Sequence, residues 1–150
     1  MRKRLGRRQF LKTAAGASAA VAATRGLDAA SYSRVKGANE RISIGIIGCG
    51  GRGSGAHMPG IHKHQQAINF EITALSDPYR PAREKASALV KEWHGRDARV
   101  FASHRDVIAL KDVDAVMIAS PDHLHARQLE DAARAGKHTY VEKPIARNME

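Results

Sequence analysis

The sequence contains one cysteine, Cys49, in 150 residues. No disulfide can form within the chain, so it is not one of the disulfide-stabilised scaffolds common among small exported proteins. No stretch is apolar enough for a stable bilayer span, which takes about 20 strongly apolar residues. Residues 13–24 are too few, and consist mostly of Ala, Gly, Ser and Val. Internal repeats are also lacking.

The composition is that of a globular protein, with 43% hydrophobic and 27% charged residues,. The length suits one ordinary domain with a packed core. The net charge of +10 is unevenly distributed. Residues 1–40 hold nine of the 25 basic and two of the 15 acidic residues, which leaves 16 and 13 for residues 41–150. The basic character therefore belongs to the terminus, and no nucleic-acid partner is predicted for the folded body.

The basic N-terminus has an ordered pattern, in which Arg7-Arg8 is followed by Gln9, Phe10, Leu11 and Lys12. This run resembles the twin-arginine export signal, R-R-x-F-L-K, at every defined position. A weakly apolar segment with small residues follows, as in a signal peptide, and cleavage after Ala22 is one of several options. The alternative is a basic, disordered arm that contacts nucleic acid or anionic lipid.

These features predict a signal peptide over residues 1–30, a linker over 31–40 and one domain over 41–150. The implied partner is the twin-arginine translocase, and the implied location is periplasmic or extracytoplasmic. That pathway carries folded proteins, which suits a chain that captures a cytoplasmic cofactor before export.

Beyond the linker, short apolar runs alternate with helical patterns. The predicted strands are 42–47, 71–75, 100–101, 115–119 and 139–141, and the predicted helices include 81–93, 105–110 and 123–135. Helix 81–93 carries an apolar face at i, i+4, i+7, i+8 and i+11. The strands are apolar on both faces, which indicates a parallel sheet covered on both sides. The predicted fold class is α/β, a Rossmann-type doubly wound parallel sheet.

Six glycines fall between Gly45 and Gly55, directly after the first predicted strand. Among them, residues 48–53 form a G-x-G-x-x-G motif from Gly48, Gly50 and Gly53. Such glycines allow a tight turn, close approach of a pyrophosphate and close helix packing, in that order. The phosphates then meet free N–H groups at the start of the following helix. The motif therefore predicts a dinucleotide site.

Asp77 follows the second predicted strand, 24 residues after Gly53, where a carboxylate can hold a ribose diol,. A carboxylate there repels a 2′-phosphate, so NAD is favoured over NADP. Arg80 and Arg83 lie near enough to weaken that preference, with exposed helix cations as the alternative. For Asp77 itself, the alternative is a turn residue before proline.

Other local features receive less specific interpretations. Pro59-Gly60 predicts a first helix that is short, kinked or restarted. Histidines cluster around this break, at His57, His62 and His64. They lack a carboxylate or cysteine partner at ligand spacing, so solvent-facing histidines are expected and no metal site is predicted. Cys49 is interpreted as a small filler within the glycine motif, with a reactive thiol as the alternative.

The C-terminal third carries three further motifs in order. They are Ser120-Pro121 with His125, then Gly136-Lys137-His138, then Glu142-Lys143-Pro144. With the glycine motif, they resemble the glucose-fructose oxidoreductase and inositol dehydrogenase family (Gfo/Idh/MocA) over about residues 40–150. The resemblance implies hydride transfer between a nicotinamide cofactor and a sugar or cyclitol hydroxyl.

The resemblance also assigns residues. The cofactor contacts it implies are Gly48, Gly50, Gly51, Arg52, Gly53, Asp77, Ser120, Pro121, His125, Glu142 and Lys143. Lys143 is the implied catalytic residue, because an ammonium can orient a hydroxyl oxygen and stabilise its developing charge. A structural hydrogen bond remains open for His125. Pairing with Lys143 and contact with the cofactor both remain open for Glu142.

Members of this family carry a second α/β domain with the substrate pocket, which is absent from these 150 residues. We therefore expect part of a longer enzyme, able to bind NAD but not to turn over substrate efficiently. Two other functions remain open. One is glycoside cleavage with bound NAD, in a group of relatives that tends to lack the lysine at position 143, and the other is a non-catalytic nucleotide-binding module. The oligomeric state is also open, a homo-oligomer included.

Overall fold

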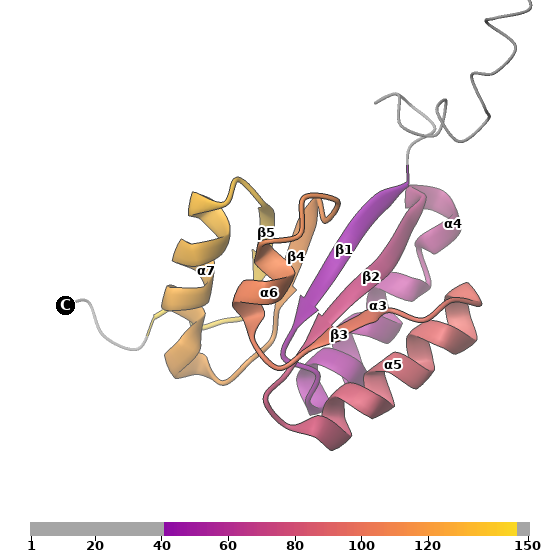
Figure 1. Ribbon diagram of the computed structural model, residues 1–150, viewed down its shortest axis with the longest axis horizontal. Helices are drawn as coiled ribbons and strands as arrows, with labels where there is room; N and C mark the ends of the chain where they lie inside the picture. Colours follow the sequence, from indigo (N-terminus) through magenta and orange to yellow (C-terminus); the bar gives the residue numbers. More distant parts are fainter. Residues whose placement is uncertain (1–40, 147–150) are drawn as a thin grey trace, which may run out of the picture. The chain divides into compact units, whose positions relative to one another are not determined.

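The computed structural model of the protein describes residues 41–146, so the predicted signal peptide and linker lie outside the described residues. Strands and helices alternate along this part of the chain (Figure 1). The strands are β1 (Ile42–Ile47), β2 (Phe70–Ser76), β3 (Arg99–Phe101), β4 (Ala115–Ile118) and β5 (His138–Val141). The helices are η2 (Gly53–His57), α3 (Met58–His62), α4 (Gln65–Ile68), α5 (Arg80–His94), α6 (His104–Ile108), η3 (Asp122–Leu124) and α7 (His125–Arg134).

The five strands form one parallel sheet in the order β3-β2-β1-β4-β5. β1 lies at the centre, and the chain builds outward from it first on one side and then on the other. α3 and α5 pack on one face of the sheet, while α6 and α7 pack on the opposite face (Figure 1). This confirms the predicted doubly wound α/β fold.

The sheet separates two apolar cores. Successive residues of a strand point to opposite faces, so Ile46 enters the core beneath α3 and α5, and Ile47 enters the core beneath α6 and α7. Ala74 and Leu75 of β2 divide in the same way. Because both faces are covered, the inner strands place apolar residues toward both cores, as the sequence indicated,. Polar residues interrupt β1 and β2, and two of them, Ser43 and Thr73, hydrogen-bond to each other.

The first helical segment is irregular, as predicted from Pro59-Gly60. Helical structure begins at Gly51, widens into the π-helix η2, and continues as α3 with Pro59 in its first turn. The Met58 N–H donates to the Gly53 carbonyl, five residues back, at the end of η2. Pro59 lacks an N–H, so it is tolerated where one helical register ends and the next begins.

The histidines near this break differ from the prediction. His57 and His62 are partly buried, and only His64 faces solvent. His62 stacks on Trp93 of α5, with ring centroids 4.3 Å apart and an interplanar angle of 10°. The prediction failed because Trp93 lies 31 residues away in sequence and gives no local signal. Within residues 41–146, no cluster of three or more His, Cys, Asp or Glu side chains is arranged to hold a metal ion.

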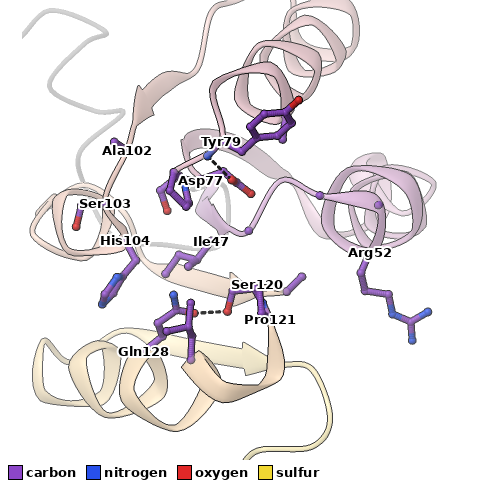
Figure 2. A pocket seen from close by; sticks show the side chains of 18 residues that line it. Ile47, Arg52, Asp77, Tyr79, Ala102, Ser103, His104, Ser120, Pro121 and Gln128 are labelled. Atoms are coloured by element: carbon purple, nitrogen blue, oxygen red, sulfur yellow. Dashed lines mark hydrogen bonds between the residues drawn. The ribbon is translucent and has the colours of Figure 1, made fainter.

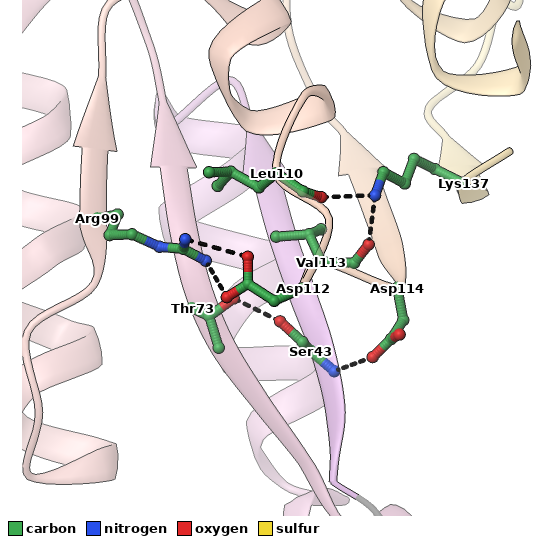
Figure 3. A network of polar contacts seen from close by, with 8 residues as sticks. All are labelled: Ser43, Thr73, Arg99, Leu110, Asp112, Val113, Asp114 and Lys137. Atoms are coloured by element: carbon green, nitrogen blue, oxygen red, sulfur yellow. Dashed lines mark hydrogen bonds and ion pairs between the residues drawn. The ribbon is translucent and has the colours of Figure 1, made fainter. Parts of the chain in front are cut away.

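A polar network closes the amino-terminal edge of the sheet (Figure 3). The Lys137 Nζ donates to the carbonyls of Leu110 and Val113, at 2.6 and 2.7 Å. These two carbonyls lie in the loop between α6 and β4, and Arg99 of β3 forms a bidentate ion pair with Asp112 of that loop. The lysine of the Gly-Lys-His motif therefore holds the loop between α6 and β4 at the edge away from the carboxyl ends of the strands.

Replacing Lys137 with methionine should lower the free energy of unfolding by about 1.5–3 kcal/mol. Two carbonyls lose a charged donor, and hydrogen bonds to charged groups contribute in that range. Urea denaturation of the wild type and the variant measures the difference. The matched control is Lys111→Met, because Lys111 is an exposed lysine in the loop between α6 and β4, and the expected change is within about 0.5 kcal/mol. Equal stabilities for both variants would contradict the assigned role.

No helix formed by residues 41–146 has the length and hydropathy needed to cross a bilayer.

Candidate functional site

A cleft of about 730 Å³ opens at the carboxyl ends of the strands (Figure 2). It is lined by the loops that follow β1, β2, β3 and β4, together with Leu124 and Gln128 from the segment after β4. Asp77 and Tyr79 lie on one side, and Ser120 and Pro121 on the other (Figure 2). In parallel α/β sheets, ligands bind at this edge, beside the central strand, where the order in which strands are added to the sheet reverses,.

The glycine loop, residues 48–52, lines the cleft, and close packing explains two of the glycines of the G-x-G-x-x-G motif. Gly48 has a φ of +92°, and a Cβ there would lie 2.5 Å from the Ser120 backbone N. A Cβ on Gly53 would lie 1.9 Å from the Gly48 carbonyl oxygen. Neither side chain could be accommodated without moving backbone. Gly48 lets the loop after β1 lie against the loop after β4, and Gly53 lets the first helix lie close to the end of β1.

Gly50 and Gly51 differ from these two, because a Cβ on either would meet nothing within 4 Å. Both line the cleft, and the helix starts at Gly51. Their exposed amides lie at the positive end of the first helix, an arrangement suited to an anion. Gly53, by contrast, is buried behind the loop and supports its shape.

Asp77 connects the glycine loop to the loop after β2. Its Oδ2 accepts a hydrogen bond from the Cys49 N–H and its Oδ1 accepts one from the Tyr79 N–H, both at 2.8 Å. The bond to Tyr79 is the turn interaction left open by the sequence. A carboxylate has about four acceptor sites, so Asp77 can also accept hydrogen bonds from a ligand in the cleft.

Two arginines beside Asp77 have partners of their own. Arg80 forms an ion pair with Glu84 on the exposed side of α5, at 2.7 Å. Arg83 donates to the carbonyls of Asp77 and Pro78. Neither arginine is among the described residues that line the cleft, whereas the Asp77 carboxylate lines the wall after β2. This geometry favours an unphosphorylated ribose, as in NAD.

Cys49 is buried within the glycine loop, with a relative exposure of 1%. Burial, followed by the negative charge of Asp77, raises the pKa of the Cys49 thiol to about 12. Because the thiolate is the reactive form, the filler interpretation fits better than the reactive one.

The folded protein should therefore react very slowly with Ellman's reagent. At pH 7, a thiol with that pKa is ionised in roughly one molecule in 10⁵. Cys49 should react at the rate of an ordinary thiol only after unfolding in guanidinium chloride, as followed at 412 nm. Rapid reaction of the native protein would contradict the burial of this side chain.

The opposite wall is stabilised by a side chain that the sequence analysis missed. Ser120 Oγ donates a hydrogen bond to Gln128 Oε1 on α7 (Figure 2). Gln128 is buried and lines the cleft. Its only sequence signal is a polar residue on the inner face of a helix, one turn after His125.

A second hollow of about 330 Å³ adjoins the cleft and shares Arg52, Ala119 and Ser120 with it. His125, Glu142 and Lys143 also line it. The structure therefore brings ten of the eleven predicted cofactor residues to the two hollows, and Gly53 lies behind them.

His125 is buried, with both ring nitrogens close to backbone carbonyls. Its Nδ1 lies 2.8 Å from the Pro144 oxygen and its Nε2 lies 2.7 Å from the Ser120 oxygen. These contacts join the loop after β4 to the loop after β5. His125 therefore has a structural role in this arrangement, one of the two options left open by the sequence.

Glu142 supplies a buried carboxylate to the smaller hollow. Its Oε1 lies 2.8 Å from Arg52 Nε and 2.7 Å from His57 Nε2. Its Oε2 accepts the Lys143 N–H at 3.0 Å. The hydrogen bond from Arg52 is the main cause of a lowered Glu142 pKa. Glu142 therefore pairs with Arg52 and with the main chain of Lys143, while its side chain makes no ion pair with the Lys143 ammonium within residues 41–146.

Lys143 follows Glu142 and is exposed. Its peptide bond to Pro144 is cis. Within the part of the chain that the structure describes, its ammonium forms no ion pair, so it is available to a ligand in the smaller hollow.

Comparison with known proteins shows what kind of domain these residues form. Residues 42–150 match the family described as "Oxidoreductase family, NAD-binding Rossmann fold". The chain is 31% identical to glycosyl hydrolase family 109 protein 2 of Shewanella sp. strain ANA-3, over 96% of this chain and 34% of that protein. It is 35% identical to inositol 2-dehydrogenase of Gluconacetobacter diazotrophicus, over 71% and 30% respectively.

A solved structure shows the same fold. The WlbA dehydrogenase from Bordetella pertussis, in complex with NADH and UDP-GlcNAcA, is 33% identical with a TM-score of 0.62, and the match covers 71% of this chain and 30% of that one. The chain thus spans about a third of the length of these relatives. The chain belongs to the Gfo/Idh/MocA oxidoreductase family, and its residues 42–150 form the NAD-binding Rossmann domain of that family.

Proposed function

We propose that this chain is the NAD-binding part of an exported oxidoreductase that transfers a hydride between a nicotinamide cofactor and a sugar or cyclitol hydroxyl. The observation that carries the proposal is the place of Lys143. Its exposed ammonium lines a hollow that shares Arg52 and Ser120 with the dinucleotide cleft. A cation beside a cofactor cleft, with no ion-pair partner among residues 41–146, is suited to act on a reacting oxygen.

The residues of the cleft fit the parts of a dinucleotide. The open amides of Gly50 and Gly51 suit the pyrophosphate, and the Asp77 carboxylate suits a ribose diol. NAD, when bound, supplies the hydride acceptor. Lys143 orients the substrate hydroxyl and stabilises the negative charge that develops on its oxygen as the hydroxyl proton passes to water and the hydride to NAD.

The substrate class is supported by the relatives. One is an inositol 2-dehydrogenase, and another holds NADH with a UDP-sugar. The test is to assay a protein carrying this domain and its remaining sequence against a panel of inositols and sugars with NAD. We expect absorbance at 340 nm to rise with at least one of them. NAD binding without NADH formation on any member would contradict the dehydrogenase.

A second candidate is NAD-dependent cleavage of a glycosidic bond. It is favoured by the match to a family 109 glycosyl hydrolase, which extends over 96% of the chain. The presence of Lys143 favours the dehydrogenase, because the glycosidase group tends to lack that lysine. Nitrophenyl glycosides discriminate between the two candidates. Nitrophenol release without net NADH accumulation would support the glycosidase, and no release would support the dehydrogenase.

The export proposal is supported by Arg7-Arg8 and the residues that follow. Residues 1–30, fused to a reporter protein that folds in the cytoplasm, should direct it to the periplasm. Replacing both arginines with lysine should stop export while the fusion accumulates inside the cell. Fractionation of both strains gives the result, and periplasmic reporter in the double variant would contradict a twin-arginine signal.

A further inference from the structure

Glu142 joins parts of the chain that are far apart in sequence. It is separated from Arg52 by 90 residues, yet Arg52 Nε donates to its Oε1 at 2.8 Å. Glu142 is 7% exposed, so the carboxylate is buried between its partners. His57, from η2, approaches the same oxygen and packs edge-on against Tyr140 of β5. One carboxylate oxygen is thus fixed by the first helical segment.

The other carboxylate oxygen acts on Lys143. Glu142 Oε2 accepts the Lys143 N–H at 3.0 Å, a bond within the turn that carries the lysine side chain. A change in the direction of the carboxylate would alter this bond and hence the backbone orientation at Lys143. Glu142 therefore connects two parts of the site. Its Oε1 is held by Arg52, and its Oε2 holds the main chain of Lys143.

Arg52 belongs to both hollows. Its main chain lies in the glycine loop, one residue after Gly51, and its side chain reaches Glu142. The side chain is 61% exposed, so it has no tight packing to fix it apart from this ion pair. A ligand seated on the loop amides contacts the segment from which the guanidinium extends.

We propose that Arg52 and Glu142 are positioning residues that couple occupation of the glycine loop by a dinucleotide to the placement of Lys143. The inference rests on the proposed function, in which Lys143 acts on the substrate hydroxyl. In this inference, Glu142 affects the reaction by placing Lys143 and does not itself contact the substrate. Both residues should therefore affect Lys143 without being required for NAD binding.

The experiment uses the 150-residue chain labelled with ¹⁵N-lysine, and the Lys143 amide is identified by its loss from the spectrum of Lys143→Arg. Arg52→Gln is the main variant, because its exposed side chain can be replaced without disturbing a core. Glu142→Gln is the second variant. Arg80→Gln, which also removes an ion-paired arginine, is the matched control. Thermal unfolding confirms that each variant is folded.

In Arg52→Gln and Glu142→Gln, the chemical shift of the Lys143 amide should differ from its wild-type value by more than that of any other lysine amide. NAD should still bind, within about tenfold of the wild-type Kd, because the Gly50 and Gly51 amides and Asp77 remain. NAD should also change the chemical shift of the Lys143 amide in the wild type, and this change should be smaller in both variants. Arg80→Gln should match the wild type in all three readouts.

An unchanged Lys143 amide in folded Arg52→Gln would overturn the inference and leave the proposed function intact. Loss of NAD binding in both variants would also overturn it, because these residues would then belong to the cofactor site itself. Failure of the wild-type chain to bind NAD would overturn the proposed function as well. The two failures are thus distinguishable from the wild-type titration alone.

Discussion

Replacing Gly53 with alanine should lower the free energy of unfolding by at least about 3 kcal/mol and abolish NAD binding. A Cβ at this position would lie 1.9 Å from the Gly48 carbonyl oxygen, which is backbone and cannot rotate away. Relief of the clash requires the first helix to move off β1, and the loop amides that face the cleft would move with it. Urea denaturation measures the stability, and calorimetric titration with NAD measures the binding.

Gly55→Ala is the matched control for this prediction. Gly55 lies in the same π-helix, is exposed, and a Cβ there would meet nothing within 4 Å. Alanine is favoured over glycine in a helix by about 0.5–1 kcal/mol, so this variant should be slightly more stable and bind NAD normally. If Gly53→Ala behaved like Gly55→Ala, the close approach of the helix to β1 would be wrong.

Replacing Lys143 with methionine in the active enzyme should lower kcat by about 10² to 10⁴. The ammonium acts on charge that develops in the transition state, and its loss therefore affects kcat more than the binding of NAD. We expect the Kd for NAD to change by less than about tenfold. Steady-state kinetics at saturating substrate, with a separate NAD titration, gives both quantities.

Two further variants sharpen this test. Lys143→Arg keeps the charge but replaces a compact ammonium with a planar fork, so it should recover only part of the lost activity. Lys85→Met removes an exposed lysine on α5 and should match the wild type. An unchanged kcat in Lys143→Met would contradict the catalytic assignment. A raised KM with the same kcat would instead indicate a role in ground-state binding.

Much of the fold followed from local patterns. The apolar runs predicted all five strands to within one or two residues, and the apolar face of helix 81–93 predicted α5 to within one residue at each end. The helix predicted over 123–135 is divided, because Asp122–Leu124 forms a separate 3-10 turn before α7. The π-helix Gly53–His57 was not predicted, because the sequence indicated only a break at Pro59-Gly60 and offered no local pattern for a π-helical register.

The sequence predicted which residues would gather at this edge of the sheet better than it predicted their contacts. Gly48, Asp77 and Lys143 each follow a strand, so their common edge follows from parallel pairing alone. The link from Arg52 through Glu142 crosses 90 residues and has no local pattern. The same holds for Gln128 beside Ser120 and for Trp93 beside His62. Such contacts depend on tertiary packing, which spacing in the sequence does not encode.

The central place of β1 governs when the cleft can form during synthesis. β1 pairs with β2 and with β4, and Ile44 is matched with Ala115, 71 residues later. Ribosomes add about 5–20 residues per second, so one edge of β1 waits roughly 4–14 s for its partner. Until then that edge is open to wrong pairing, and the Gly48 turn lacks the Ser120 wall. The nascent domain can accept a nucleotide in this cleft only after β4 is made.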